Sequence, residues 1–293
     1  GDDTISGGPG ADRIDGGGGR NTLRDTLADM NGDTIVNMGS STGLQFGGTS
    51  VGLDGLKVTP AAGGVTLEIG TTSMTLTGSF DGGTFMAVGR GTGGSATTDV
   101  SFAPYLPTLV EGVQVAAAAI NGVANTAFLR GDGAVHFTAT LEAAFSAFGN
   151  AIGAYRLADS GAISGVHLLF ANTHAPGAVG ATVDLGKPAS GESLGFFLVQ
   201  DAAAHFAALP NDLSFARSGG GLPVLTSASL GTLDAVTVFH ATSALNAGNA
   251  VQVLSGVSAN GQDLHIGFED LPNGIGDNDF QDIVLRVHTD LLS

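Results

Sequence analysis

The sequence predicts an all-β protein, in which a short parallel β-roll with a β-rich cap is followed by an antiparallel β-sandwich domain. Three observations predict this class. Glycine and aspartate recur with a nine-residue period at the start of the chain, apolar and polar residues then alternate in short segments, and turn signals follow about every eight to twelve residues. We place the roll at residues 1–36, the cap at 37–104 and the sandwich at 105–293.

The nine-residue period opens the chain. The stretch GGPGADRID, residues 7–15, fits the pattern G-G-x-G-x-D-x-U-x, where U is a large aliphatic residue. The next copy has Asn21 in the aspartate position, the preceding fragment has Asp3 there, and Asp33 belongs to an imperfect fourth copy. Glycine allows the positive φ of tight turns, and the aliphatic residue of each copy points inward. A glycine-rich flexible linker is the alternative, but linkers do not keep phase.

The aspartates of the repeat predict a calcium site. Asp3, Asp12 and Asn21 are expected to stack on one edge of the roll. Two carboxylates about 5 Å apart repel by roughly 3 kcal/mol at an effective dielectric constant of about 20. Carboxylate and backbone carbonyl oxygens are the ligands of calcium, so binding and folding become one equilibrium. The candidate ligands in the repeats are Asp3, Gly8, Gly10, Asp12, Gly17, Gly19 and Asn21.

Residues 1–36 resemble the RTX nonapeptide repeats of calcium-binding proteins exported by bacterial type I secretion. This resemblance implies a calcium-bound β-roll. Asn21 departs from the pattern, so we expect only one or two strong calcium positions in this short array. Because the chain begins within a repeat and without methionine, we expect it to be the carboxy-terminal part of a longer protein.

Short strands between glycine turns are predicted for the cap. The alternation in VTLEI and MTLTG is typical of half-buried strands, and the segment resembles the region that often closes the open end of RTX rolls. Within it, Asp29, Asn31 and Asp33 place oxygen-bearing side chains at alternating positions. This spacing predicts either a further calcium loop or a solvated turn, because it lacks the downstream glutamate of the common calcium loop.

The sandwich is predicted from strand segments such as VHFTATL, IGAYRLA and SLGFFLVQD. Alanine runs favour helix by propensity, but the frequent NG, GDG and DSG turns favour a β-sandwich. We retain one short helix at residues 201–209, which Pro210 would end. A smaller helical piece near residues 113–127 is the remaining alternative to strand.

A second acidic stretch lies between the apolar segments LHIGF and IVLRV. Strands on both sides would hold its carboxylates together, which again favours a cation, whereas a solvated acidic hairpin loop is the alternative. The order GFEDLP…GDNDFQD followed by a strand resembles the closing motif of the domain of unknown function DUF4114, with a looser likeness over residues 130–288. The resemblance implies a calcium-associated β-sandwich of secreted or surface proteins. The candidate ligands here are Glu269, Asp270, Asp277, Asp279 and Asp282.

Composition narrows the set of partners. The formal net charge is −17 with only 10 Lys and Arg, so nucleic acid and anionic membrane surfaces are poor partners. No apolar run is long enough to span a bilayer, so we expect no membrane insertion. Ser193 in GESLG fits G-x-S-x-G, but its flanks do not predict a strand followed by a helix, so we interpret it as a turn residue. No catalytic residue is predicted.

These observations predict a calcium-dependent folding and structural module of a type I secreted bacterial protein, extracellular or at the cell surface, that acts in adhesion, matrix or surface-layer assembly. Low cytosolic calcium would keep the carboxylates repelling and the roll unfolded, and calcium outside the cell would drive folding. The expected partners are calcium and a surface or matrix polysaccharide or another copy of the chain. The alternatives are the calcium module of a larger secreted hydrolase and a calcium-dependent carbohydrate-binding module.

Overall fold

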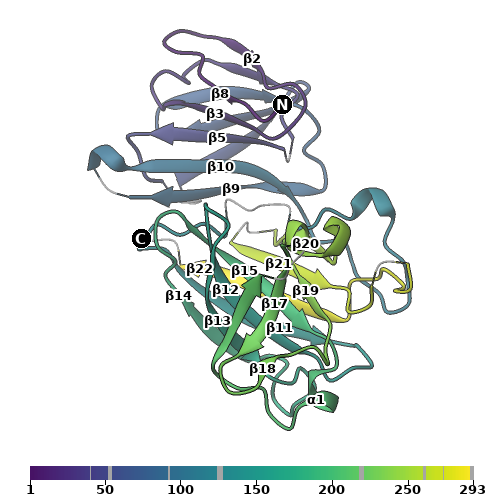
Figure 1. Cartoon of the computed structure of the whole chain (residues 1–293). Coiled ribbons are helices and arrows are strands. Elements are labelled where there is room, and N and C mark those ends of the chain that lie inside the picture. The colour runs from purple at the N-terminus through teal and green to yellow at the C-terminus, as the bar shows by residue number, and fades with distance from the viewer. Residues whose placement is uncertain are drawn as a thin grey trace. The chain divides into compact units, whose positions relative to one another are not determined.

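The computed structural model describes residues 1–39, 41–51, 55–91, 93–123, 128–217, 221–259, 262–272 and 274–290. Strands dominate these residues, which confirms the predicted all-β class (Figure 1). The chain divides into two compact units. Unit 1 is built on residues 1–105, with short pieces from the end of the chain, and unit 2 on residues 106–256 and 263–289.

The first strands of unit 1 wind as a parallel β-roll. They are β1 Thr4–Ile5, β2 Arg13–Asp15, β3 Asn21–Thr26, β4 Thr34–Val36, β5 Thr42–Gly47 and β8 Thr72–Thr77. β1, β3 and β5 pair in parallel in a first sheet. β2, β4 and β8 pair in parallel in a second sheet. Successive strands therefore alternate between two sheets, and two nine-residue copies make one turn of the roll.

This winding corrects the predicted single edge of stacked ligands. Asp3 donates its amide to Asn21 on the first sheet, whereas Asp12 donates its amide to Asp33 on the second. Each copy runs across the roll, so a strand meets its partner two copies later and not in the next copy. Asp12 therefore does not stack with Asp3 and Asn21.

Antiparallel strands extend both sheets and confirm the strands predicted for the cap. They are β6 Leu56–Ala61, β7 Gly64–Ile69, β9 Gly83–Arg90 and β10 Thr97–Pro104. β10 and β9 follow β5 in the first sheet, while β7 and β6 follow β8 in the second. The parallel roll thus passes into antiparallel strands within the same two sheets.

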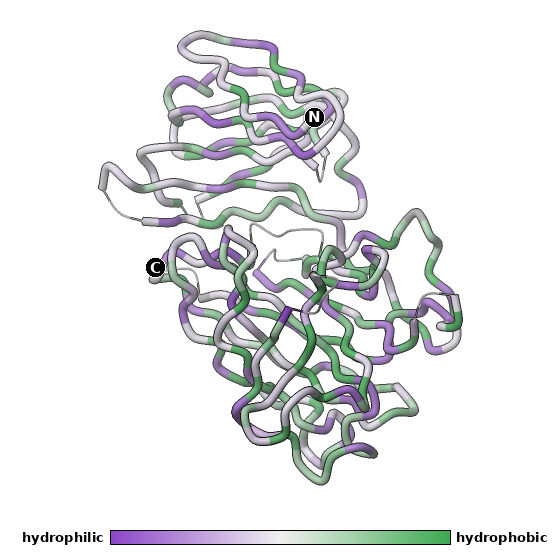
Figure 2. The backbone as a smooth tube through the Cα atoms, viewed as in Figure 1, coloured by the Kyte–Doolittle hydropathy of each residue, from purple (hydrophilic) through white to green (hydrophobic). Residues whose placement is uncertain are grey.

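The roll and the cap share one hydrophobic core. The repeat aliphatics form two pairs, Ile5 with Leu23 on the first sheet and Ile14 with Ile35 on the second. All four belong to or pack against the same core as Leu76 of the cap. Figure 2 shows hydrophobic residues interspersed along these strands. Burial of one such side chain contributes about 2 kcal/mol, so the cap supplies the apolar area that the repeats lack.

The described residues of unit 2 form three sheets. Their strand orders are β14-β11-β22-β21-β20, β13-β12-β15-β19 and β16-β17-β18. The strands are β11 His136–Ala144, β12 Ala151–Ala158, β13 Ile163–Phe170, β14 Thr182–Gly186, β15 Glu192–Val199, β16 Leu213–Arg217, β17 Pro223–Ser227, β18 Gly231–Thr232, β19 Val238–His240, β20 Val253–Val257, β21 Asp263–Phe268 and β22 Ile283–Asp290. The four-stranded sheet and the pair formed by β21 and β22 are antiparallel, as the sandwich prediction requires.

The four-stranded sheet is buried on both faces. Tyr155 and Phe197 face a core that includes Leu225 of the three-stranded sheet. Ile152 and Leu198, which pair with each other across β12 and β15, point to the opposite face and are also fully buried. A strand that is covered on both faces has apolar residues at consecutive positions. This explains why the four residues FFLV of β15 are all apolar.

Helical structure in unit 2 is shorter than predicted. The helix expected at residues 201–209 is a single turn, α1 Ala202–His205, because the backbone is extended at Phe206, which packs against the core that contains Leu209. In the segment 113–127 the structure has one short 3-10 turn, Ala117–Ala119, and residues 124–127 lie outside the described residues.

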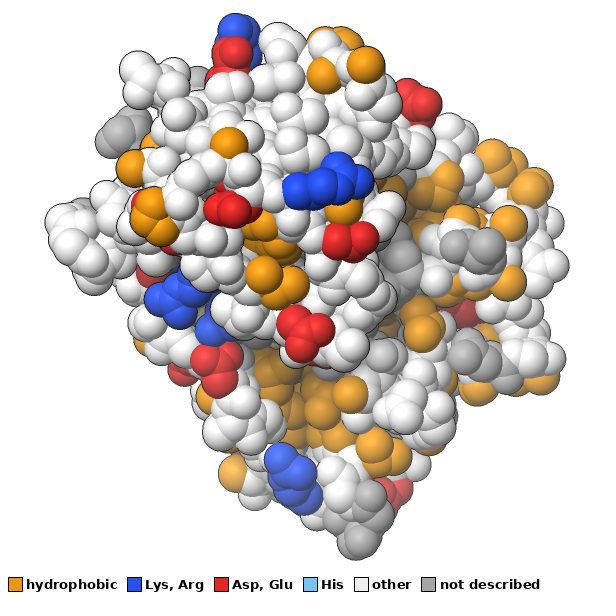
Figure 3. Space-filling view, turned by 90° about the horizontal axis from the view of Figure 1, so that it is seen from above, with side chains coloured by type: hydrophobic (Ala, Val, Ile, Leu, Met, Phe, Trp, Pro, Cys, Tyr) orange, Lys and Arg blue, Asp and Glu red, His pale blue; other side chains and the backbone are white. Residues whose placement is uncertain are grey.

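On the face shown in Figure 3, charged side chains lie dispersed among hydrophobic side chains and other uncharged groups. This distribution agrees with the low content of charged residues, 13% of the chain. In the part of the chain that the structure describes, no helix combines the length and the apolar character needed to cross a bilayer.

Candidate calcium sites

The turn before β2 encloses the carboxylate of Asp12. Gly8 and Gly10 have φ values of 76° and 136°, which only glycine adopts readily. A Cβ on Gly7 would lie 3.1 Å from Asp12 Oδ2, so the backbone closes over this oxygen. Asp12 Oδ2 is buried and has no hydrogen-bond partner among the described residues. Such an oxygen costs about 1–3 kcal/mol when unpaired, and a bound cation removes that cost. The turn therefore fits a calcium ion.

Asp33 adds a second carboxylate beside this turn. It is 1% exposed, and its Oδ1 accepts a hydrogen bond from the Asp12 amide at 2.8 Å. Burial raises the pKa of Asp33, the hydrogen bond from the Asp12 amide opposes this rise, and the charge of Asp12 adds to it. Positive charge near Asp12 would relieve both the burial cost and the repulsion.

The turn at Asn21 is hydrogen-bonded internally. Asn21 Oδ1 accepts the Asp3 amide at 3.1 Å, which repeats the relation between Asp33 and Asp12. Asn21 Nδ2 donates to the carbonyls of Gly17 and Gly19 at 3.5 and 3.4 Å. The turn carbonyls thus accept hydrogen bonds from an amide NH₂ group that aspartate would lack. This turn is satisfied without an ion, in contrast to the turn at Asp12.

The structure directs Asp29, Asn31 and Asp33 to three different partners. Asp29 Oδ2 accepts the Thr26 hydroxyl at 2.6 Å, and Asn31 Oδ1 accepts the Ser73 amide at 3.0 Å. Asp33 instead faces the preceding turn of the roll, as described above. Asn31 is exposed and Asp29 is half-buried. These contacts favour the solvated turn over a shared calcium loop.

Asp25 also contacts the Asp12 turn, and the sequence analysis did not select it. Its Oδ2 accepts the Gly8 amide at 2.8 Å and the Ser6 hydroxyl at 2.6 Å, and the hydrogen bond from Ser6 is the largest influence that lowers the pKa of Asp25. Asp25 lies in β3, which pairs with β1, and from there it holds the turn that contains Asp12. It lies outside the motif positions of the repeat, so only the winding of the roll identifies it.

The acidic residues near the end of the chain lie in one long loop. This closing loop, residues 269–282, joins β21 to β22, and Phe268 pairs with Ile283 where the two strands meet. The loop carboxylates divide into two groups, in each of which one oxygen per residue lies within 4.8 Å of the others. The inner group is Glu269, Asp270 and Asp282, and the outer group is Asp277 and Asp279 together with Glu111.

Hydrogen bonds fix the inner group. Asp270 Oδ2 accepts the Ser146 hydroxyl and, at 2.6 Å, the Asn150 side-chain amide. Asp282 Oδ2 accepts the Asp270 amide at 2.9 Å. Ser146 and Asn150 lie in the loop between β11 and β12, and the sequence analysis did not select them. The two carboxylates are therefore positioned by a different part of unit 2.

Glu269 is the buried member of the inner group that lacks a complete set of donors. It is 1% exposed, and its Oε2 has no hydrogen-bond partner among the described residues. Burial raises the pKa of Glu269 to about 7, and the charge of Asp277 adds to the rise. Burial also raises the pKa of Asp282. A buried carboxylate in this setting requires a proton or a cation, and an all-oxygen donor set suits calcium.

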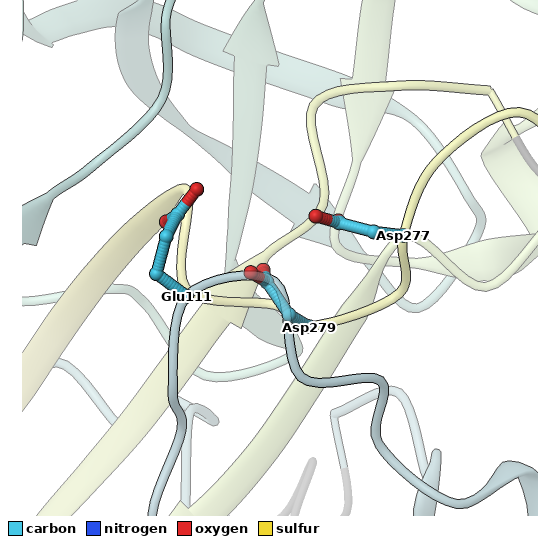
Figure 4. A group of neighbouring side chains, drawn as sticks. All are labelled: Glu111, Asp277 and Asp279. Atoms are coloured by element: carbon cyan, nitrogen blue, oxygen red, sulfur yellow. The ribbon is translucent and has the colours of Figure 1, made fainter.

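The outer group joins the closing loop to the segment that follows β10. Figure 4 shows Asp277 and Asp279 on the loop with Glu111 on the facing segment. Asp279 is 2% exposed, while Glu111 and Asp277 are exposed. Asp279 Oδ2 accepts the Gly112 amide at 2.7 Å, across 167 residues of sequence. No spacing pattern along the chain could have identified Glu111.

Two family models match the chain. Residues 1–23 match the RTX calcium-binding nonapeptide repeat (4 copies), and residues 189–290 match the domain of unknown function DUF4114. The chain carries RTX calcium-binding repeats and a DUF4114 domain. Both resemblances seen in the sequence are confirmed, and Ca²⁺ is the ion of the RTX repeats. Neither the curated proteins nor the solved structures gave a match.

The DUF4114 match contains the whole closing loop but not every residue of its acidic groups. It begins at residue 189, so Glu111, Ser146 and Asn150 precede it. The RTX match ends at residue 23, before Asp25 and Asp33. The structure therefore completes both acidic regions with residues from outside the matched segments.

Proposed function

We propose that the chain is a calcium-dependent folding and structural module of a type I secreted bacterial protein, extracellular or at the cell surface, with a role in adhesion, matrix or surface-layer assembly. RTX repeats bind calcium and are typical of such secreted proteins. The observation that carries the proposal is the buried Asp12 Oδ2, which lacks a partner among the described residues inside a glycine turn of the repeats. This oxygen makes the folded roll depend on a cation.

Calcium acts on folding through mass action. An ion present at a hundredfold excess over its Kd stabilises the folded state by about 2.7 kcal/mol per site. Domain stabilities are only about 5–15 kcal/mol, so two or three sites decide whether a marginal domain folds. Low calcium inside the cell then keeps the roll unfolded for export, and higher calcium outside folds it.

A calcium titration followed by circular dichroism and calorimetry tests this function. We expect chelation to reduce the strand signal and the melting temperature of the parent chain. Asp12→Ala and Asp279→Ala should each remove part of the calcium-dependent stabilisation. Asp234→Ala, which changes an exposed aspartate outside both acidic regions, should behave as the parent. A chelated parent chain with unchanged circular dichroism and melting temperature would rule out the folding switch.

We further propose that the module is not itself catalytic. Ser193 lies in β15, opposite Leu157 of β12, and not in the turn that we predicted, because the strand begins earlier than expected. Its hydroxyl donates to the Leu157 carbonyl at 3.3 Å. A serine nucleophile elbow requires a sharp turn between strand and helix, which this paired strand does not provide. Ester hydrolysis that Ser193→Ala abolishes would contradict this view.

A further inference from the structure

The connector, residues 106–115, leads from β10 into unit 2 and lies against the closing loop. The Gly112 amide donates to Asp279 at 2.7 Å. The Val115 amide donates to the carbonyl of Asn278 at 2.9 Å. Two hydrogen bonds thus attach the connector to two consecutive residues of the loop.

Acidic groups crowd this attachment. Glu111 of the connector places a carboxylate oxygen within 4.8 Å of those of Asp277 and Asp279 (Figure 4). The pKa of Glu111 is raised, first by desolvation and then by the charges of Asp279 and Asp277. Three like charges meet where the connector is held, so repulsion opposes the two hydrogen bonds unless a cation lies between the groups.

A buried carboxylate behind this group is a separate indication of a cation. Glu269 is 1% exposed and its Oε2 has no partner among the described residues. Its side chain extends to the outer residues of the loop, since a Cβ on Gly276 would lie 2.4 Å from Glu269 Oε1. After burial, the charge of Asp277 is the largest influence that raises the pKa of Glu269. Glu269 is therefore oriented toward the same part of the loop that Glu111 faces.

We propose that Glu111, Asp277 and Asp279 form a calcium site, distinct from the RTX sites, that fastens the connector to the closing loop. This inference rests on the proposed function in that calcium is the ion. Carboxylates from two distant segments share one ion, and Asp279 is aligned for it by the amides of Gly112 and Gln281. Exposed Glu111 and Asp277 leave the site open to solvent, so the ion exchanges readily and calcium concentration controls the attachment.

Hydrogen exchange of the full chain, followed by mass spectrometry with and without calcium, tests the attachment directly. We expect calcium to slow exchange of the Gly112 and Val115 amides at least tenfold. Glu111→Gln should abolish this slowing and lower the calcium stoichiometry by one in titration calorimetry. Asp277→Asn, which alters an exposed ligand, should give the same result, and Asp234→Asn should leave both measurements as in the parent.

The outcomes separate this inference from the proposed function. If calcium folds the roll but Glu111→Gln and Asp277→Asn keep the parent stoichiometry and protection, the connector site is wrong and the folding module stands. If calcium protects the connector but leaves the strand signal of the roll unchanged, the connector site stands and the folding module is wrong. The probe throughout is Ca²⁺ alone.

Discussion

One side-chain atom distinguishes the turns at Asp12 and Asn21. Both residues occupy the same position of the repeat, but Asn21 accepts the Asp3 amide through its side chain, whereas Asp12 donates its own amide to Asp33. Asn21 adds an NH₂ group that donates to two carbonyls of its own turn. Asp12 has instead an oxygen without a donor among the described residues. The turn at Asn21 therefore closes by itself, and the turn at Asp12 requires an ion.

Asn21→Asp should convert the self-contained turn into a calcium-dependent one. Without calcium, the loss of two hydrogen bonds and the approach of a carboxylate to carbonyl oxygens should destabilise unit 1 by about 1–3 kcal/mol. With calcium, the variant should recover this stability and bind one additional ion. Denaturation with and without chelator, together with titration calorimetry, measures both effects. Equal stability loss in both conditions would contradict the role of Asn21 Nδ2.

His240 introduces sensitivity to acid in unit 2. It is 1% exposed, both ring nitrogens lack partners among the described residues, and the ring packs against Phe215 and Tyr155. Burial lowers the pKa of His240 to about 4 from its ordinary value of 6.5. The unfolded chain therefore takes up a proton at a higher pH than the folded one, and stability is lost as the pH falls from about 6.5 toward 4.

Replacement of the imidazole should remove this loss. Between pH 7 and pH 5 we expect the free energy of unfolding of the parent to fall by about 2 kcal/mol more than that of His240→Phe. The variant keeps an aromatic ring among the same neighbours. Urea denaturation of calcium-loaded protein at the two pH values gives the comparison. If both proteins lost the same free energy, His240 would not be the acid-sensitive group.

Strands β5 and β8 link the repeats to the cap. Each pairs in parallel with a strand of the repeats on one side and antiparallel with a cap strand on the other. Their buried side chains belong to the same core as the repeat aliphatics. Because the short repeat strands bury few residues of their own, the stability of the roll depends on these two strands.

Loss of packing in β8 should therefore affect the repeats. Leu76 is fully buried, and Leu76→Ala should lower the free energy of unfolding of unit 1 by about 2–5 kcal/mol and weaken calcium binding by the repeats. Val58→Ala on β6, where the side chain is 38% exposed, should change stability by only about 0.5 kcal/mol. Denaturation in saturating calcium measures the difference. If the destabilised Leu76→Ala protein kept the calcium affinity of the parent, calcium binding by the repeats would not depend on packing in the cap.

At the scale of the whole molecule, negative charge opposes the folded state. The formal net charge is −17, and acidic groups gather at the repeats and at the closing loop. Bound calcium neutralises part of this charge at the positions where it is most crowded. Monovalent salt screens it without binding, since the Debye length falls from about 30 Å at 0.01 M to about 3 Å at 1 M.

Salt should thus stabilise the calcium-free chain more than the calcium-loaded chain. Between 0.01 M and 0.5 M NaCl we expect the melting temperature to rise by several degrees in chelator and by clearly less in saturating calcium. Differential scanning calorimetry of both forms provides the measurement. Equal shifts would show that calcium does not relieve the repulsion.

Local patterns identified a large part of the fold and of the sites. The phase of Gly, Asp and aliphatic residues predicted the turns at Asp12 and Asn21, and alternation predicted the cap strands β6 to β9. The dense carboxylates and flanking apolar segments located the closing loop. The predicted helix at residues 201–209 was too long because alanine propensity is a local quantity, whereas Phe206 and Leu209 are drawn into the core.

The sequence by itself determined the repeat period, the all-β class, the calcium-binding repeats and the acidic loop, because each depends on residues close together in the chain. Only the tertiary structure decided that Asp12 stacks on Asp33 and not on Asn21, and that Glu111 meets Asp279. These relations arise from strand pairing and from contacts between distant segments. Their free energy depends on which backbones become neighbours, and no spacing along the chain encodes that choice.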